Sequence, residues 1–323
     1  MKSTKIGLTL GDPGGIGPEI VIRLLEHPSE LPPAEVIIFG QRVILENWSE
    51  KLGHKADWLN RVLAQQKITI KEIGRPLDEV VCGMPSAENG LASFYFFESA
   101  VEAARKEEIK AMVTAPVSKT SWQLAGIKYR GHTEYLEKLY PHAIMSFWSN
   151  RLQLALFTHH LPLKEAIDRV KKESLVNFII NLDQSLKLWN LGIKEFLMCG
   201  LNPHAGEGGI MGLEEQNEII PAVIEARKRK INLNGPFPPD TVFLQGVDRP
   251  DKLVICLYHD QGLIPFKLIS FQSGVNLTLG MPFIRTSPDH GTAFDLAGKG
   301  LASYLSLKEA LWLAWNASKV KEG

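Results

Sequence analysis

The sequence predicts an α/β protein with mainly parallel sheets, and two observations lead to this class. Short apolar runs typical of strands alternate with longer segments of helical periodicity along the whole chain. Several of these runs are continuously hydrophobic, which is typical of strands that helices cover on both faces. The length of 323 residues also predicts about two domains.

Each predicted element corresponds to one such run or segment. The predicted strands are residues 6–10, 36–39, 68–70, 111–114, 152–158, 195–199, 241–244 and 253–258. The predicted helices are residues 18–25, 92–106, 163–187, 213–230 and 307–320. Pro18 suits the first turn of its helix, because the N–H that proline lacks would have no partner there. Residues 234–240 are rich in Gly and Pro and predict a loop.

Composition and charge exclude several classes of protein. Lys plus Arg and Asp plus Glu are both 36, so the formal net charge is zero, which argues against a nucleic-acid or membrane-surface partner. Cys82, Cys199 and Cys256 are odd in number and far apart, so a disulfide framework is not expected. The apolar run at residues 6–10 is too short for a signal peptide, and no run approaches a membrane span. We therefore expect a cytoplasmic protein.

Three histidines follow strand-like runs and precede loops. These are His160, which comes directly after His159, then His204 and His259. The carboxyl ends of parallel strands meet at one edge of a sheet, so the three imidazoles could form a divalent-metal site there. The alternative is that each is an ordinary hydrogen-bonded structural histidine.

Acidic residues follow two of these histidines, and a carboxylate can support a metal-bound imidazole. They are Asp260 after His259, and Glu207, Glu214 and Glu215 after His204. The alternative for Glu214 and Glu215 is a solvent-facing position at the start of a helix, which their sequence context favours.

A second group of residues suits an anion. Lys267, Asn276 and Arg285 can hold a carboxylate or phosphate, with arginine supplying a two-pronged contact. Residues 131–134, with His132 and Thr133, open a predicted turn of helix and could donate to the same anion. The alternatives are a helix cap for Thr133 and a solvated charge for Lys267.

Two glycine-containing loops could bind a nucleotide or an anion. Residues 11–19 lie between a predicted strand and helix, but they do not match the G-x-G-x-x-G fingerprint, so a tight turn is the alternative. Residues 287–300 read as a histidine-glycine turn entering a helix, and Asp295 could accept hydrogen bonds from the ribose of NAD while repelling the 2′-phosphate of NADP. A simple helix-start turn is the alternative here.

Together these segments resemble the 4-hydroxythreonine-4-phosphate dehydrogenase family of pyridoxal phosphate biosynthesis. The resemblance spans almost the whole chain and rests on GDPGGIGPEI (11–20), TAPVSK (114–119), GHTEYL (131–136), THHLPL (158–163), NPHAGEGG (202–209), GPFPPDT (235–241), YHDQGLIPFK (258–267) and VNLTLGMPFIRTSPDHGTAFDLAGKG (275–300). The last segment also resembles the adenosine loop of isocitrate and isopropylmalate dehydrogenases. Two departures are Gly14, where the family usually has alanine, and the extra His159.

The resemblance implies an isocitrate/isopropylmalate dehydrogenase-like fold of two α/β/α domains with a cleft between them. It implies a discontinuous cofactor-side domain, residues 1–130 plus 275–323, and a metal- and substrate-binding, dimer-forming domain, residues 131–274. It also implies a homodimer whose active site lies at the subunit interface, and a small phosphorylated substrate rather than nucleic acid or membrane.

The same resemblance implies roles for particular residues. The divalent metal ion (zinc, magnesium, manganese or cobalt) would be held by His160, His204 and His259, with His160 chosen over His159 because it precedes Leu-Pro-Leu. The implied substrate contacts are His132, Thr133, Lys267, Asn276 and Arg285. The implied NAD contacts are Asp289, His290, Gly291, Thr292 and Asp295. Asp240 and Asp260 are candidates for proton transfer.

The implied reaction is NAD-dependent oxidation of 4-phosphohydroxy-L-threonine at the 3-hydroxyl, then decarboxylation to 3-amino-2-oxopropyl phosphate. One alternative is a dehydrogenase of 4-phosphothreonate or 4-phosphoerythronate, which differ at the 2-substituent. A metal-dependent hydrolase would keep the histidines but would not need the adenosine loop, and a ligand sensor would bind without turnover. NAD binding and a substrate panel separate these alternatives.

Overall fold

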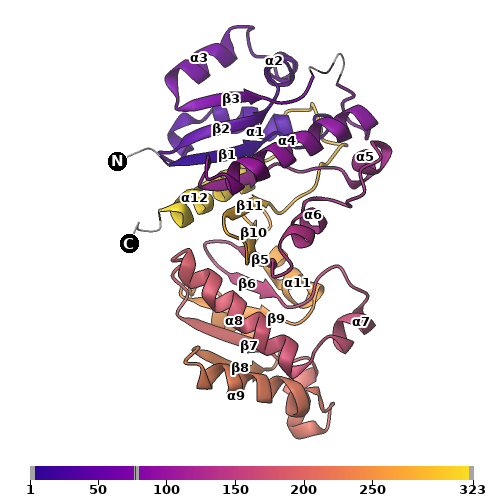
Figure 1. Cartoon of the computed structure of the whole chain (residues 1–323), viewed down its shortest axis with the longest axis vertical. Coiled ribbons are helices and arrows are strands. Elements are labelled where there is room, and N and C mark those ends of the chain that lie inside the picture. The colour runs from indigo at the N-terminus through magenta and orange to yellow at the C-terminus, as the bar shows by residue number, and fades with distance from the viewer. Residues whose placement is uncertain (1–3, 76, 78–79, 320–323) are drawn as a thin grey trace. The chain divides into compact units, whose positions relative to one another are not determined.

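The computed structural model describes residues 4–75, 77 and 80–319 (Figure 1). The chain divides into two compact units, Met1–Pro141 with Pro282–Gly323, and His142–Met281. The first unit is therefore discontinuous, and its boundaries lie after Pro141 and Met281 rather than after residues 130 and 274. The difference has a local cause at each end. His132 packs on aromatic side chains of the first unit, and residues 275–279 pair with a strand of the second unit.

The first unit is built on a parallel sheet. Its strands are β1 (Lys5–Thr9), β2 (Glu35–Gly40), β3 (Ile68–Glu72), β4 (Ala111–Thr114) and β11 (Ile284–Pro288), in the order β3-β2-β1-β4-β11. The described pairs β1–β2, β1–β4, β2–β3 and β4–β11 are all parallel. The order reverses between β1 and β4, and such a reversal is where open α/β sheets place ligands.

Helices cover both faces of this sheet. They are α1 (Gly17–Leu25), α2 (Arg42–Lys51), α3 (Trp58–Gln65), α4 (Ala87–Arg105), α5 (Lys119–Leu124), α6 (His132–Leu139) and α12 (Leu305–Ser318), with a 3₁₀ turn at Pro28–Glu30. Because parallel crossovers are right-handed, α1 and α4 lie on opposite faces on either side of the reversal. The α12 helix packs on α1, β4 and β11. Both faces are covered, so β1 after Lys5 and all of β4 are buried, whereas β3 at the edge of the sheet is largely exposed.

The second unit has a mixed sheet. Its strands are β5 (Ile144–Trp148), β6 (Gln153–Leu156), β7 (Glu195–Cys199), β8 (Leu233–Phe237), β9 (Lys252–Cys256) and β10 (Val275–Leu279), in the order β10-β5-β6-β9-β7-β8. The β10–β5 and β5–β6 pairs are antiparallel, whereas β6–β9, β9–β7 and β7–β8 are parallel. The α/β class with mainly parallel strands is thus confirmed.

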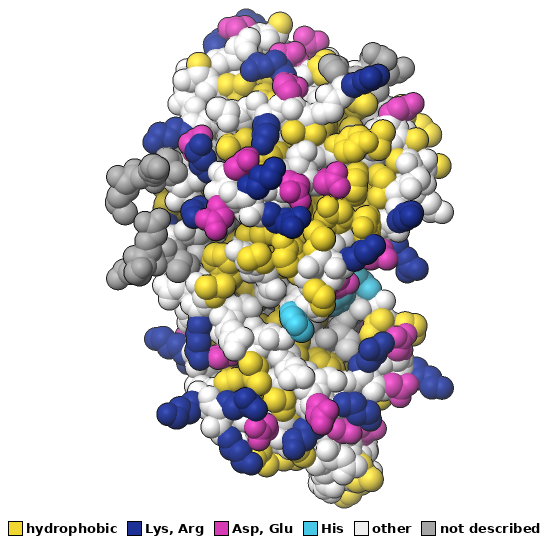
Figure 2. Space-filling model, in the orientation of Figure 1, with side chains coloured by type: hydrophobic (Ala, Val, Ile, Leu, Met, Phe, Trp, Pro, Cys, Tyr) yellow, Lys and Arg dark blue, Asp and Glu magenta, His cyan; other side chains and the backbone are white. Residues whose placement is uncertain are grey.

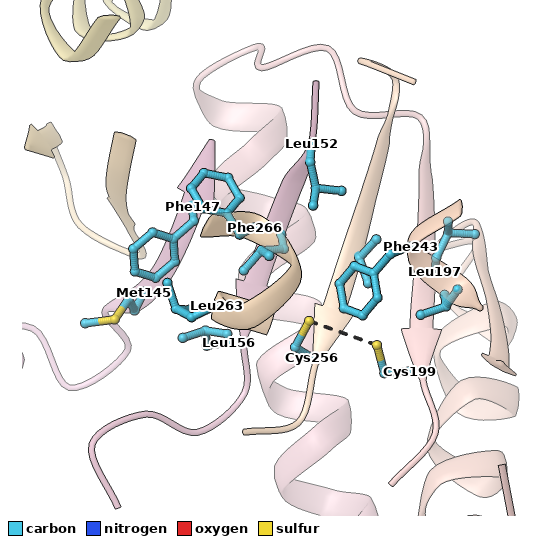
Figure 3. Close-up of a cluster of buried hydrophobic side chains, with 13 residues drawn as sticks. Met145, Phe147, Leu152, Leu156, Leu197, Cys199, Phe243, Cys256, Leu263 and Phe266 are labelled. Atoms are coloured by element: carbon cyan, nitrogen blue, oxygen red, sulfur yellow. Dashed lines mark hydrogen bonds between the residues drawn. The ribbon is translucent and has the colours of Figure 1, made fainter. Parts of the chain in front are cut away.

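Alternate residues of this sheet face a hydrophobic core. The helical elements of the unit are α7 (Leu163–Asp168), α8 (Lys172–Leu188), a 3₁₀ segment (Pro203–Gly209), a π-helical turn (Glu215–Ile219), α9 (Ile220–Lys228), α10 (Val242–Gly246) and α11 (His259–Ser270). Leu154 and Leu156 of β6 pack in one cluster with Phe243 of α10 and Phe266 of α11 (Figure 3). The period of two along each strand directs every second side chain into this cluster.

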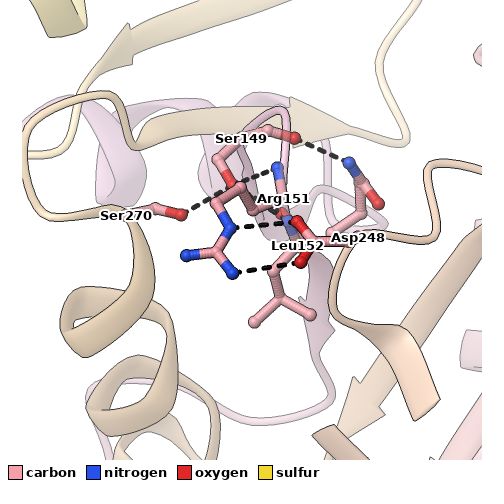
Figure 4. A network of polar contacts seen from close by, with 6 residues as sticks. Ser149, Arg151, Leu152, Asp248 and Ser270 are labelled. Atoms are coloured by element: carbon pink, nitrogen blue, oxygen red, sulfur yellow. Dashed lines mark hydrogen bonds and ion pairs between the residues drawn. The ribbon is translucent and has the colours of Figure 1, made fainter. Parts of the chain in front are cut away.

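A polar network fixes the turn between β5 and β6 (Figure 4). The Ser149 hydroxyl accepts hydrogen bonds from the backbone N–H groups of Arg151 and Leu152, at 3.1 and 3.0 Å. Arg151 makes a two-pronged ion pair with Asp248, at 2.9 and 3.0 Å. This geometry ties the turn to the loop before β9, although the pair is too exposed to contribute much stability.

Several predicted elements are wrong or incomplete. Residues 242–244 of the strand predicted at 241–244 belong to a helix, α10, because so short an apolar run is equally consistent with a buried helical turn. Residues 234–237 of the predicted loop belong to β8, and residues 291–300 form turns rather than a helix. The strands β5, β10 and β11 and the helices α2, α3, α5 and α11 were not predicted, whereas the helix start predicted at residues 131–134 is confirmed as the start of α6.

Two predicted long helices are interrupted. The helix predicted at 163–187 breaks before Lys172, whose N–H donates instead to the Glu218 carboxylate at 2.7 Å. The helix predicted at 213–230 begins with a π-helical turn. The last residue of the helix predicted at 307–320 lies outside the described residues.

Charge is mixed on the surface. Basic and acidic side chains are interspersed over the face drawn in Figure 2, in keeping with the zero net charge. Within the described ranges, we find no helix with the length and apolar character needed to cross a bilayer.

Truncating a fully buried side chain on α4 should test the core of the first unit. Phe96 is 0% exposed, so Phe96→Ala should lower the free energy of unfolding by about 3–5 kcal/mol, as lost burial and a cavity combine. Urea unfolding followed by circular dichroism measures this change. Leu91→Ala, at a 41% exposed position of the same helix, should change it by less than about 0.5 kcal/mol. Equal effects of the two substitutions would contradict the packing described above.

Candidate active site

Three neighbouring strands of the second unit deliver the predicted metal-binding histidines to one edge. β9 lies between β6 and β7, and all three run parallel, so their carboxyl ends share an edge of the sheet. His160 follows β6, His204 follows β7 and His259 begins α11 directly after β9. The topology therefore places all three loops side by side.

Two of these imidazoles lie close together. The ring centroids of His160 and His259 are 5.5 Å apart, and both rings line a cavity of about 250 Å³ formed by residues 158–161, the start of α7 and residues 258–260. Two imidazoles that ligate one ion at about 2.1 Å have centroids about 5 Å apart, so the observed pair fits a shared metal ion. His159 also lines this cavity, and its ring lies 5.2 Å from that of His160.

A carboxylate orients His259. Asp260 Oδ1 lies 2.6 Å from His259 Nδ1, so the carboxylate accepts the Nδ1 proton and leaves the Nε2 lone pair available for a ligand. Asp260 itself is exposed. Among the predicted acidic neighbours, this is the one in contact with a predicted metal ligand.

His204 lies in an unusual left-handed turn outside that cavity. Residues 204–208 all have positive φ, including 53° at His204 and 42° at Glu207. Such angles are costly for residues other than glycine and persist only when neighbours impose them. Among the described residues, no cluster of three or more His, Cys, Asp or Glu side chains is arranged to hold a metal ion. One chain thus brings two of the three predicted imidazoles together.

A buried carboxylate holds the loop that leads to His204. Glu215, which is 1% exposed, accepts from the N–H groups of Leu201 and Asn202 at 2.7 and 2.8 Å and from the Asn202 amide at 2.8 Å. Glu214 also accepts from the Asn202 amide at 2.7 Å, and this hydrogen bond lowers the pKa of Glu214. Glu215 does lie at the start of a helical element, as the alternative reading expected, but its carboxylate is buried and does not face solvent.

Gln261 connects two of the histidine loops, and the sequence analysis missed it. This residue is 8% exposed; its side chain donates to the Gly200 carbonyl at 2.8 Å and accepts from the Leu257 N–H at 2.7 Å. It therefore ties the loop after β7 to the end of β9. The signals that the sequence offers are its position two residues after His259 and its place in the family-like segment 258–267.

In the first unit, the predicted anion-binding residues Arg285 and His132 are in contact. Arg285 is 3% exposed; it donates to the Thr114 hydroxyl at 3.1 and 2.7 Å, and its NH2 group lies 3.1 Å from His132 Nδ1. Burial lowers the pKa of Arg285 to about 9, so the guanidinium stays charged at neutral pH. Arginine can only donate, so His132 Nδ1 is the acceptor and the Nε2 atom carries the ring proton.

His132 is held as a neutral imidazole. Burial, and then the positive charge of Arg285, lower the pKa of His132 well below its usual value of 6.5. The ring packs between Phe97 and Trp122, with centroid distances of 4.4 and 5.7 Å. Its Nε2 atom is buried and has no hydrogen-bond partner among the described residues. A buried N–H donor of this kind is suited to an anionic oxygen.

The other predicted substrate contacts are dispersed over both units. Thr133 follows His132 on α6 of the first unit and is partly exposed. Lys267 lies on α11 and Asn276 on β10, both in the second unit and both partly buried. Asp240 is exposed in the turn between β8 and α10.

The glycine-rich loop at residues 11–19 lies at the reversal point of the first sheet. The Asp12 N–H donates to the Pro116 carbonyl after β4 at 2.9 Å, and the Asp12 carboxylate accepts from the Gly14 N–H at 2.9 Å. Burial raises the pKa of Asp12. A Cβ at Gly11, where φ is 70°, would lie 2.3 Å from the Pro116 carbonyl oxygen, so this close approach requires glycine.

The segment predicted to bind NAD follows β11. Asp289, His290, Thr292 and Asp295 lie on it, and Asp295 is exposed. A side chain at Gly291 would meet open space, which leaves room for a ligand. The Ile16 N–H of the glycine-rich loop donates to the Thr292 carbonyl at 2.9 Å. The exposed carboxylate and the open backbone fit the hydroxyls of a ribose.

Comparison with known proteins gives consistent matches over nearly the whole chain. A family model described as pyridoxal phosphate biosynthetic protein PdxA matches residues 33–314. The 4-hydroxythreonine-4-phosphate dehydrogenase of Aquifex aeolicus is 40% identical, covering 96% of this chain and 97% of that protein. A protein of Halalkalibacterium halodurans named "Putative D-threonate 4-phosphate dehydrogenase" is 38% identical, covering 97% and 96%. The crystal structure of 4-hydroxythreonine-4-phosphate dehydrogenase from Klebsiella pneumoniae superposes with a TM-score of 0.82 at 33% identity, covering 98% and 100%.

The buried neutral state of His132 predicts a pH dependence of stability. The lowered pKa means that, below pH 6.5, the unfolded chain binds a proton at this residue that the folded chain does not. The free energy of unfolding should therefore decrease as the pH is lowered below 6.5. This residue should contribute up to about 1.4 kcal/mol per pH unit to that decrease. His132→Asn keeps an acceptor for Arg285 but cannot titrate, so its stability should fall less steeply between pH 6.5 and 5. Urea unfolding at several pH values measures both slopes, and equal slopes would contradict the prediction.

Proposed function

Because the chain belongs to the family of pyridoxal phosphate biosynthetic proteins described as PdxA, we propose that it is an NAD-dependent dehydrogenase acting on 4-phosphohydroxy-L-threonine. The 3-hydroxyl would lose its proton and C3 would transfer a hydride to NAD, after which the β-keto acid would release carbon dioxide. The product would be 3-amino-2-oxopropyl phosphate. The single observation that best supports this chemistry is the paired imidazoles at the shared edge of β6 and β9.

His160 and His259 would hold one divalent metal ion. When bound, the ion would polarise the substrate hydroxyl and lower its pKa, which makes loss of the proton feasible near neutral pH. In the neutral ring, Asp260 accepts the Nδ1 proton of His259, which leaves Nε2 as the ligand atom and fixes the ring orientation. Imidazole ligands favour zinc or cobalt, whereas completion by substrate and water oxygens would also suit magnesium or manganese.

A second copy of the chain would supply His204 to this site. His204 is exposed and does not line the cavity that contains His160 and His259. A homodimer is further supported by an exposed apolar stripe on α11 and its C-cap, where Ile264, Leu268 and Phe271 are 61%, 83% and 75% exposed at helical spacing. Exposed apolar surface of this kind is typical of an interface.

Arg285 and His132 would bind an anionic group of the substrate. The buried guanidinium supplies the charge and the neutral imidazole supplies one N–H donor from Nε2. Charge-assisted hydrogen bonds in a buried site are strong, which suits a phosphate or carboxylate. Thr133, Lys267 and Asn276 stay predicted substrate contacts. Asp240 stays a candidate for proton transfer, whereas Asp260 is engaged by His259.

NAD would bind the segment after β11 and accept the hydride. Asp289, His290, Gly291, Thr292 and Asp295 are the proposed contacts, and the exposed Asp295 carboxylate would accept from ribose hydroxyls. A cytoplasmic location is supported by the thiols, since Cys82, Cys199 and Cys256 are all free.

A second candidate is oxidation of a 4-phosphorylated sugar acid. Relatives that are 38% and 37% identical carry the name "Putative D-threonate 4-phosphate dehydrogenase", and their identity to this chain is similar to that of the relatives named 4-hydroxythreonine-4-phosphate dehydrogenase. The two substrates share the phosphate and the oxidised carbon, and they differ in having an amino group or a hydroxyl group at C2.

Absorbance at 340 nm should identify the substrate and the cofactor. We expect NADH production with 4-phosphohydroxy-L-threonine that a chelator abolishes and a divalent metal restores. The panel includes 4-phosphothreonate and 4-phosphoerythronate, and turnover of only these would replace the vitamin-pathway assignment by the second candidate. Absence of NADH with every substrate would contradict the dehydrogenase proposal and favour hydrolysis.

Mixing two inactive variants should test the shared metal site. If His204 comes from a second copy, an equal mixture of His204→Ala and His160→Ala subunits contains dimers with one complete site and should recover about a quarter of the native activity. A mixture of His160→Ala with His259→Ala is the control, because one chain contributes both rings, and it should stay inactive. Recovery in neither mixture would contradict a site completed by a second copy.

A further inference from the structure

The segment that carries the proposed NAD contacts has little structure of its own. From Asp289 to Ala302 it contains no helix, and its internal backbone hydrogen bonds belong to short turns within residues 293–299, such as the Leu296 N–H to the Ala293 carbonyl at 2.9 Å. Ala293 has a φ of 39°, which is costly for a residue with a side chain. Such a segment keeps one shape only if groups outside it satisfy its backbone.

A buried carboxylate on α1 satisfies the end of this segment. Glu19 is 0% exposed, and its two oxygens accept from the Gly298 N–H at 2.8 Å and the Ala302 N–H at 3.0 Å. One turn further along α1, Arg23 donates to the Gly300 carbonyl at 2.6 Å. Two side chains of one helix therefore bind three alternate residues of the segment.

The other end of the segment is fixed by the loop that precedes α1. The Ile16 N–H donates to the Thr292 carbonyl at 2.9 Å, and a Cβ at Gly15 would lie 2.9 Å from the same oxygen. The exposed Asp295 lies between these two attachment points. The conformation that Asp295 presents to a ligand therefore depends on contacts with residues 15–23 on both sides of it, in addition to the turns within the segment.

We propose that Glu19 and Arg23 are positioning residues for NAD, which preorganise the segment 289–302 before the cofactor binds. This inference rests on the proposed function. A segment that is ordered in advance loses less conformational freedom on binding. Glu19 and Arg23, which we call the clamp, should therefore contribute to NAD affinity without touching the cofactor. A carboxylate suits this role because its two oxygens can each accept a hydrogen bond from one of the two N–H groups, those of Gly298 and Ala302.

Glu19→Gln tests the proposal with little change in shape. Glutamine offers one oxygen and one NH₂ group, so one of the two N–H groups at residues 298 and 302 would face a donor. We expect the dissociation constant of NAD, measured by calorimetry on the metal-loaded enzyme, to rise by about tenfold. The kcat at saturating NAD and the KM of the phosphorylated substrate should change less than about twofold. Hydrogen exchange should accelerate at the amides of residues 298 and 302.

A second variant and a control keep the test decisive. Arg23→Gln removes the bond to Gly300 and should also weaken NAD binding, which covers the case in which Glu19→Gln does not fold. Glu46→Gln changes a partly exposed carboxylate on the neighbouring α2 that pairs with Arg42, and it should bind NAD as the native protein does.

The outcomes separate this inference from the proposed function. If the native protein does not bind NAD, the proposed function and the clamp inference are both wrong. If the native protein binds NAD and both clamp variants bind it within about twofold of native, only the clamp inference falls. A parallel rise in the dissociation constant of NAD and the KM of the substrate would show general loosening of the unit, and would also overturn it.

Discussion

Both units depend on one constraint, which is that the irregular loops at the strand ends need hydrogen-bond acceptors for their backbone N–H groups. These groups lie beyond the sheet and have no partner on a neighbouring strand. A buried N–H without an acceptor costs free energy comparable to a lost hydrogen bond. Two buried carboxylates meet this demand. Glu19 accepts from Gly298 and Ala302 in the first unit, and Glu215 accepts from Leu201 and Asn202 in the second. In each case, the loop so held carries residues proposed to bind a ligand.

The hydrogen-bond partner of each imidazole likewise determines which of its ring nitrogens carries the proton. Asp260 accepts the Nδ1 proton of His259, which leaves Nε2 as the ligand atom, whereas Arg285 donates to Nδ1 of His132, which leaves Nε2 as a donor. One imidazole is therefore prepared to bind a cation and the other to bind an anion. The difference lies in a single neighbour, a carboxylate in one unit and a guanidinium in the other.

Much of the site could be predicted because histidines that could bind a metal ion follow apolar runs in the sequence. His259 comes directly after a predicted strand and His160 follows another after one intervening residue, and parallel strands bring such residues to one edge. Gln261 and Glu215 could not be predicted in the same way. Their roles depend on which backbone groups lie within hydrogen-bond reach across the sheet, and no local pattern encodes that. The helix α10 was mistaken for a strand for a related reason, since only its packing distinguishes the two.

The sequence by itself determined the α/β class, the strands β4 and β7 to the residue and the motifs that indicate the family. Periodicity and local motifs act over a few residues, so they can be read without coordinates. The tertiary structure alone decided the mixed strand order of the second unit, the charge state of His132 and the clamp of Glu19 on residues 298–302. Each of these depends on burial and on contacts between residues far apart in the chain. Glu19 and Ala302 are 283 positions apart, and only folding brings that carboxylate to that N–H.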